Sequence, residues 1–161
     1  MRRAGYRLRY NVLYYKKCKG NIKPIDYVVW AYSMLEKEYF SPSLSILASL
    51  KEPLNLFEVE QFFERAKREL GLTEPTYEES VGDYVQYLIQ QILLDKQKAI
   101  EIAYEIYTIL RDHNNDEKTY RWYEISEMID DFQYGDNVNN ITQDMLIKII
   151  LQEAEKQLER D

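Results

Sequence analysis

Four carboxylates lie close together in the last third of the chain, and they are its first candidates for chemistry. Glu124, Glu127 and Asp131 are three and four residues apart, so on a helix they share one face, with Asp130 beside them. Carboxylates grouped in this way can hold a magnesium ion or act as general acid and base. The opposite face would be apolar, as in any amphipathic surface helix, through Trp122, Ile125, Ile129 and Phe132. The pattern therefore favours an acidic patch that faces solvent or a partner over a metal site.

The side chains that most often catalyse reactions near neutral pH are almost absent, since the chain has one histidine and one cysteine. His113 stands in a stretch without apolar residues, which predicts an exposed loop histidine. Cys18 cannot form an internal disulfide, which agrees with a reducing cytoplasm, and we expect it to be partly buried on the first helix. The five glycines are too scattered for a phosphate-binding loop. We therefore predict no catalytic residue and no cofactor, and an enzyme is the less favoured reading.

A second candidate site begins at Asp112, which with Asn114 and Asp116 has the spacing of the first ligands of a calcium-binding loop. Glu117 then stands where such a loop needs glycine, and Tyr123 stands where it needs a bidentate carboxylate. Because both mismatches fall at essential positions, we expect these residues to end one helix and lead into the next, without metal.

Fifteen tyrosines in 161 residues make this chain unusually aromatic. Several are paired three residues apart on expected helices: Tyr84 with Tyr87, Tyr104 with Tyr107, and Tyr120 with Tyr123. Most should bury the ring and leave the hydroxyl wet or hydrogen-bonded. Exposed tyrosine beside clustered acids would instead suit a partner rich in Arg and Lys. The sequence thus predicts a protein-binding surface made of Tyr120, Tyr123, Glu124, Glu127, Asp130 and Asp131.

Charge is distributed unevenly along the chain. Residues 1–23 contain eight basic residues and no acid, while the rest contains 13 basic and 28 acidic residues, a net charge of −15. An acidic body disfavours nucleic acid as the general partner and is compatible with a basic protein. The overall net charge is −7.

The basic N-terminal segment is where RNA or DNA could be contacted, through Arg2, Arg3, Arg7, Arg9, Lys16 and Lys17. The rings of Tyr10, Tyr14 and Tyr15 could then stack on bases. The favoured alternative is that residues 1–23 form a basic helix or arm that docks on the acidic body of the same chain.

Capping signals divide the chain into about eight helices, which begin near Leu8, Pro24, Pro42, Asn55, Thr76, Asp95, Thr119 and Thr142. Over residues 6–14 a strand-like alternation competes with helix, and helix is favoured because no partner strand is evident. We found neither a regular repeat nor a linker rich in Gly, Pro or Ser. Short connections predict antiparallel neighbours. The expectation is an all-α, single-domain irregular bundle over residues 1–161, with no membrane-spanning segment.

The first half of the chain carries a weakly diagnostic set of residues: Gly20, Ile25, Trp30-Ala31-Tyr32, Leu47-Ala48-Ser49-Leu50 and Phe57-Glu58-Val59-Glu60. In this set the chain resembles a family of small uncharacterised bacterial all-helical proteins. That resemblance implies an all-α fold and no known activity. The size and acidity are also similar to those of bacterial immunity proteins, which neutralise basic toxins, and this similarity is an analogy of size and charge.

Three hypotheses follow. The first is a non-catalytic protein in the cytoplasm whose acidic, tyrosine-bearing surface binds a basic protein, as an immunity or inhibitor protein would. The second is a metal-dependent enzyme that uses carboxylates alone. The third is nucleic-acid contact through the basic N-terminal segment. The oligomeric state cannot be read from the sequence.

Overall fold

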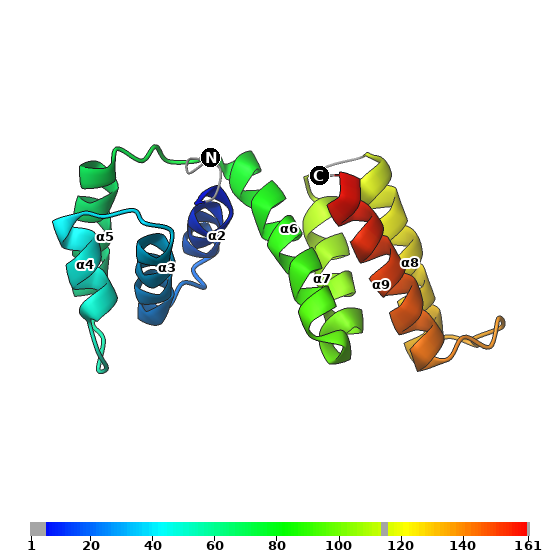
Figure 1. Cartoon of the computed structure of the whole chain (residues 1–161). Coiled ribbons are helices and arrows are strands. Elements are labelled where there is room, and N and C mark those ends of the chain that lie inside the picture. The colour runs from blue at the N-terminus through cyan, green and yellow to red at the C-terminus, as the bar shows by residue number, and fades with distance from the viewer. Residues whose placement is uncertain (1–5, 114–115, 161) are drawn as a thin grey trace. The chain divides into compact units, whose positions relative to one another are not determined.

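The computed structural model describes residues 6–113 and 116–160, and within them it is all-α, as predicted (Figure 1). Eight α-helices and one short 3-10 helix, and no strand, occur in these ranges: α2 (Arg7–Cys18), α3 (Pro24–Glu36), α4 (Pro42–Ser49), α5 (Leu56–Leu70), α6 (Tyr77–Leu94), η1 (Lys96–Lys98), α7 (Ala99–Arg111), α8 (Glu117–Tyr134) and α9 (Gln143–Arg160). The ambiguous segment near residue 10 is therefore helical. None of the described helices has the length and apolar character that crossing a membrane requires.

Most helix starts follow the predicted capping chemistry. Ser41 Oγ accepts the Leu44 backbone N–H at 3.1 Å, and Asn55 Oδ1 accepts that of Glu58 at 3.1 Å. At the expected start near Thr76, Thr76 and Glu79 form a reciprocal capping box, with both bonds at 3.1 Å. These side chains satisfy amide donors that have no partner within their own helix.

The start of α8 differs from the prediction. Asp116, three residues before the expected start at Thr119, is the N-cap, and its Oδ1 accepts the Thr119 backbone N–H at 3.0 Å and the Thr119 hydroxyl at 3.1 Å. Thr119 therefore lies inside the first turn instead of opening the helix. The polar residues Glu117 and Lys118, which precede the expected start at Thr119, are helical because the cap precedes them.

The chain divides into two compact units, Met1–Tyr84 and Val85–Asp161, and the boundary falls inside α6. We call them the N-terminal unit and the C-terminal unit and describe each by itself. The expectation that residues 1–161 form one domain stays a prediction.

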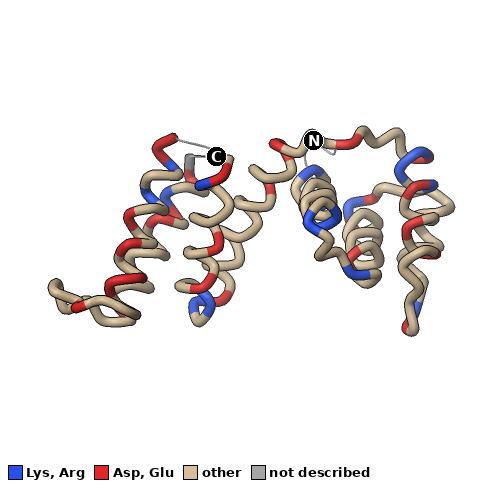
Figure 2. The backbone as a smooth tube through the Cα atoms, turned by 180° about the vertical axis from the view of Figure 1, so that it is seen from behind, with Lys and Arg blue, Asp and Glu red and all other residues tan. Residues whose placement is uncertain are grey.

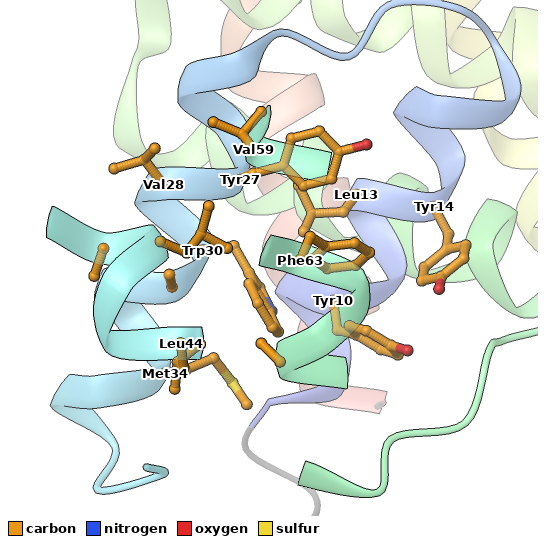
Figure 3. Close-up of a cluster of buried hydrophobic side chains, with 14 residues drawn as sticks. Tyr10, Leu13, Tyr14, Tyr27, Val28, Trp30, Met34, Leu44, Val59 and Phe63 are labelled. Carbon is orange, nitrogen blue, oxygen red and sulfur yellow. The ribbon is translucent and has the colours of Figure 1, made fainter. Parts of the chain in front are cut away.

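The N-terminal unit is built around Phe63 of α5 (Figure 3). Its ring lies within 4.9 Å of the Tyr27 ring and 5.1 Å of the Trp30 ring, measured between centroids, and α2 adds Tyr10 and Tyr14 at slightly longer range. α3, α4 and α5 pack on one another, and α2 packs on α3. Aromatic rings in edge and tilted contacts thus fill the space among four helices.

Two of the core tyrosines, Tyr14 and Tyr27, have hydrogen-bonded hydroxyls, whereas the buried hydroxyl of Tyr10 has no hydrogen-bond partner among the described residues. Tyr27 donates its hydroxyl to Glu60 at 3.0 Å, and Lys67 donates to the Tyr14 hydroxyl at 2.8 Å. Burial raises the hydroxyl pKa of Tyr27 and Tyr14 above the usual range, so both stay neutral. Tyr14 and Tyr27 thus bury the ring and hydrogen-bond the hydroxyl, as expected of most tyrosines, whereas Tyr10 buries its hydroxyl as well.

Lys67 is the main charged group buried in the N-terminal unit, and its surroundings compensate that burial. Its ammonium lies 2.8 Å from Glu64 and 2.7 Å from Glu74, and 5.8 Å above the Phe63 ring. Burial alone would lower the pKa of Lys67, but the hydrogen bonds to Glu64 and Glu74 outweigh it and raise the pKa. The charged Lys67 side chain therefore links α2, α5 and the segment before α6.

In the C-terminal unit α7 packs on α8 and α9, and α8 packs on α9. Trp122, Ile125 and Ile129 form the buried face of α8, as its amphipathic pattern predicts. Trp122 Nε1 donates to Gln157 of α9 at 3.1 Å, and Gln157 donates in turn to Glu153 at 2.9 Å. The buried face of α8 thereby leaves the acidic face available for other roles.

Candidate protein-binding surface

The opposite face of α8 carries the predicted tyrosines and acids (Figure 2 marks the acidic positions in red). Tyr120 and Tyr123 are exposed, and their ring centroids lie 6.3 Å apart. The Tyr123 ring is also 5.8 Å from that of Tyr107 on α7. The aromatic surface therefore extends from α8 onto α7, where Tyr104, one turn before Tyr107, is exposed as well.

The structure separates the four carboxylates of α8 into two kinds. Glu124 lies 3.5 Å from Arg121, whose Nε is 3.2 Å from the buried Glu153 of α9. This pairing with Glu153 raises the pKa of Arg121. Glu124 is therefore paired within the chain, with the arginine that joins α8 to Glu153 of α9.

Asp131 also has a structural role. Its Oδ1 accepts the backbone N–H of Asn137 at 3.3 Å, which holds the loop after α8 against the helix end. Gly135 permits this approach, since a Cβ at that position would lie 2.6 Å from Asp131 Oδ1. Asn137 then closes the loop with two further bonds to the backbone of Ile141, at 2.9 and 3.0 Å.

Glu127 and Asp130 are different, because within residues 6–113 and 116–160 neither makes an ion pair or a hydrogen bond. The same holds for Glu101 on the first turn of α7. Unpaired carboxylates beside exposed tyrosines can pair with a cation of a partner without breaking a contact within the chain. We call Tyr104, Tyr107, Tyr120, Tyr123, Glu127 and Asp130 the α7–α8 face.

A groove of about 600 Å³ opens at one end of this face, where α8 ends and where α7 and α9 begin. Its apolar lining comes from Ile100, Ile129 and Phe132, and Tyr104 and Tyr134 add aromatic rings. Glu101 and Asp130 line it from α7 and α8, and three glutamines complete it: Gln97, Gln133 and Gln143. Sequence reasoning identified only Asp130 among these residues, because the groove forms between segments some 30 residues apart in the chain.

The charge of the two units supports a difference in role. Residues 1–84 contain 13 basic and 12 acidic residues, a net charge of +1, whereas residues 85–161 contain 8 basic and 16 acidic residues, a net charge of −8. The negative charge of the chain therefore belongs to the unit that carries the α7–α8 face.

Two of the eight basic residues of the N-terminal segment form ion pairs with acids of their own unit, and the expectation that residues 1–23 dock on the acidic body of the chain stays a prediction. Lys16 lies 3.5 Å from Asp26, and Lys17 lies 3.8 Å from Glu64. Arg7 and Arg9 are exposed, whereas Arg2 and Arg3 lie outside the described residues.

The aromatic part of the nucleic-acid hypothesis is wrong. Tyr10 and Tyr14 lie in the core, and Tyr15 is stacked on Tyr84 with centroids 4.1 Å apart. None of these rings is available for stacking on a base. The sequence pattern misled because α2 is buried along six consecutive residues, from Tyr10 to Tyr15, and not along one face alone.

The two candidate metal sites are the carboxylates of α8 and the calcium-like segment that begins at Asp112. Among the described residues, no group of three or more His, Cys, Asp or Glu side chains is placed to hold a metal ion. In the calcium-like loop, Asp116 caps α8 and Asp112 lies 3.5 Å from Arg111, whereas Asn114 is not among the described residues. His113 is exposed, as expected, but Cys18 is exposed and not partly buried.

No family model matches the sequence, and neither a curated protein nor a solved structure matches it with statistical significance. The resemblance to small uncharacterised bacterial helical proteins therefore stays a prediction.

Proposed function

We propose that this chain is a non-catalytic binding protein whose α7–α8 face engages a basic protein. The observation that carries the proposal is the combination on one face of exposed tyrosines with carboxylates that have no partner in the described part of the chain. Tyrosine supplies a large, rigid contact area, and it is enriched where binding energy concentrates. Unpaired carboxylates next to it select positively charged side chains.

The net charge of −8 in the C-terminal unit favours the same class of partner. Opposite net charges accelerate encounter and make association sensitive to salt. A bacterial immunity or inhibitor protein that neutralises a basic toxin is the setting we favour, and a reducing cytoplasm agrees with the single exposed cysteine.

The test is capture of a partner on the full-length chain from native lysate at low salt, with and without nuclease, followed by elution with salt. We expect a discrete basic protein that survives nuclease, and its affinity should fall about tenfold when salt rises from about 0.05 to 0.3 M. Recovery of nucleic acid alone would contradict the proposal and favour the exposed arginines of α2.

The face itself is tested with the triple variant Tyr120→Ser, Tyr123→Ser, Glu127→Gln. These side chains are exposed and remove no buried group, so the fold should persist while partner affinity falls at least about tenfold. Glu155→Gln on α9 is the matched control for the lost charge, because Glu155 is exposed and lies outside the face. Unchanged affinity in the triple variant would exclude the α7–α8 face as the binding site.

A further inference from the structure

The residues that line the groove at the end of the α7–α8 face indicate which type of partner side chain it would bind. Its volume of about 600 Å³ would accept a large side chain together with part of a neighbouring residue. One wall is α7 and the other is α8, and each contributes one carboxylate, Glu101 and Asp130. A cationic group entering between the walls would therefore meet negative charge on both sides.

The remaining groups of the groove distinguish between cations. Tyr104 and Tyr134 line the groove with aromatic rings, and Gln97, Gln133 and Gln143 line it with amides, whose oxygens can accept hydrogen bonds. A planar guanidinium stacks on aromatic rings and donates through five N–H groups in a fork, whereas an ammonium is a compact, strongly hydrated charge. The aliphatic stem of either side chain would cover the apolar lining formed by Ile100, Ile129 and Phe132.

The groove is also held in shape before anything binds. Ile129 is buried and fixes the floor, and the loop after α8 is closed by Asp131 and by the paired bonds between Asn137 and Ile141. Within the described ranges neither Glu101 nor Asp130 is engaged by a cation of the chain, so no intramolecular pair must break when a ligand enters. Preorganisation of this kind lowers the cost of binding.

We propose that the groove between α7 and α8 is an anchor site for an arginine side chain of the basic partner protein. This inference rests on the proposed function, because it names the residue type that the same surface recognises. The partner's guanidinium would lie between Glu101 and Asp130 and stack on Tyr104 or Tyr134, with its stem on Ile100 and Ile129.

The experiment uses a probe that needs no knowledge of the partner. The full-length protein, labelled at its isoleucine methyl groups, is titrated at low salt with acetyl-arginine amide and observed by NMR. Acetyl-lysine amide and acetyl-citrulline amide are the comparison probes, and citrulline keeps the shape of arginine without its charge. We expect the methyl signals of Ile100 and Ile129 to shift with a millimolar dissociation constant, about threefold weaker with lysine and at least about tenfold weaker with citrulline.

Two double variants with the same change in net charge then locate the site. Glu101→Gln with Asp130→Asn should weaken the arginine probe about tenfold. Glu155→Gln with Glu159→Gln is the control, since these residues lie at least 12 positions beyond Gln143 on α9, about 18 Å along the helix. The control should change the dissociation constant less than about twofold. Tyr104→Leu retains the charge and tests stacking alone.

The inference is overturned if the Ile100 and Ile129 signals do not move, if citrulline binds as well as arginine, or if both double variants weaken the probe equally. These outcomes do not decide the proposed function, which is tested by partner capture and by the Tyr120, Tyr123 and Glu127 variant outside the groove. Conversely, arginine in the groove without any basic partner from the lysate would refute the proposed function and leave the anchor site standing.

Discussion

The two units use the same residue type in opposite ways. In the N-terminal unit Tyr10, Tyr14 and Tyr27 point into the core around Phe63. In the C-terminal unit Tyr120 and Tyr134 are 61 % and 84 % exposed. The N-terminal unit is nearly neutral and the C-terminal unit carries a net charge of −8. Tyrosine thus fills the core of the N-terminal unit, although Tyr32 there is 59 % exposed, whereas no tyrosine in the described part of the C-terminal unit is buried.

The difference teaches that a partner for the hydroxyl favours burial of a tyrosine, although Tyr10 is buried with no hydrogen-bond partner for its hydroxyl among the described residues. Tyr14 and Tyr27 can be buried because Lys67 and Glu60 satisfy their hydroxyls. No hydrogen bond to the hydroxyl of Tyr120, Tyr123 or Tyr134 is formed by another described residue, so burial would cost free energy. Such side chains remain at the surface unless a binding partner covers them.

The largest expected effect is the contrast between two identical substitutions. Tyr27→Ala removes a ring that is 0 % exposed and in contact with Phe63, so it should lower the free energy of unfolding of the N-terminal unit by about 3–5 kcal/mol. Tyr120→Ala should change that of the C-terminal unit by no more than about 0.5 kcal/mol, because the ring is already in water. Similar losses in both variants would break the comparison.

Each unit contains one of the two tryptophans, and both are buried, which makes this contrast measurable. In a Trp122→Phe background, urea unfolding followed by fluorescence reports on Trp30 and the N-terminal unit. In a Trp30→Phe background it reports on Trp122 and the C-terminal unit. Coincident midpoints in the two backgrounds would support the sequence-based expectation of one cooperative domain.

Features that depend on residues close together in the sequence, such as helix starts, could be predicted. Contacts between residues far apart in the sequence could not. Ser41, Asn55 and the Thr76–Glu79 pair were recognisable as caps because capping joins residues two or three positions apart. The roles of Tyr14 and Lys67 were not, since their bond spans 53 positions. For the same reason Tyr120, Tyr123 and Glu127 could be predicted on one helix face, whereas the contribution of Glu101 and Tyr104 from α7 could not.

The next effect concerns the buried cation of the N-terminal unit. Lys67→Met keeps most of the side-chain volume but leaves the Tyr14 hydroxyl without its donor and removes both carboxylate contacts. We expect a loss of roughly 1–3 kcal/mol in the Trp30-monitored unfolding free energy. Tyr14→Phe should lower the free energy of unfolding less in the Lys67→Met variant than in the wild type, because in that variant it removes a hydroxyl that has already lost its donor. Strict additivity of the two changes would contradict a shared role.

A smaller effect is expected in the dependence of stability on pH. The hydrogen bond and charge of Lys67 lower the pKa of Glu74 below its ordinary value of 4.5. A carboxyl with a lowered folded-state pKa contributes stability that is fully present above its unfolded pKa and is lost as pH falls through the folded value. The N-terminal unit should therefore lose stability below about pH 4.5. Lys67→Met should flatten this slope, and an unchanged slope would show that Glu74 is not coupled to Lys67.

The smallest expected effect concerns the stability of the C-terminal unit. Glu101→Gln with Asp130→Asn removes two charges that have no intramolecular partner in the described chain, from a unit with excess negative charge. Stability monitored by Trp122 should stay within about 0.5 kcal/mol of the wild type or rise slightly, as repulsion is relieved. A marked loss would mean that these carboxylates maintain the fold. If the double variant keeps its free energy of unfolding but binds the arginine probe more weakly, Glu101 and Asp130 serve binding. The carboxylates around Lys67 would differ from them, because they stabilise the fold.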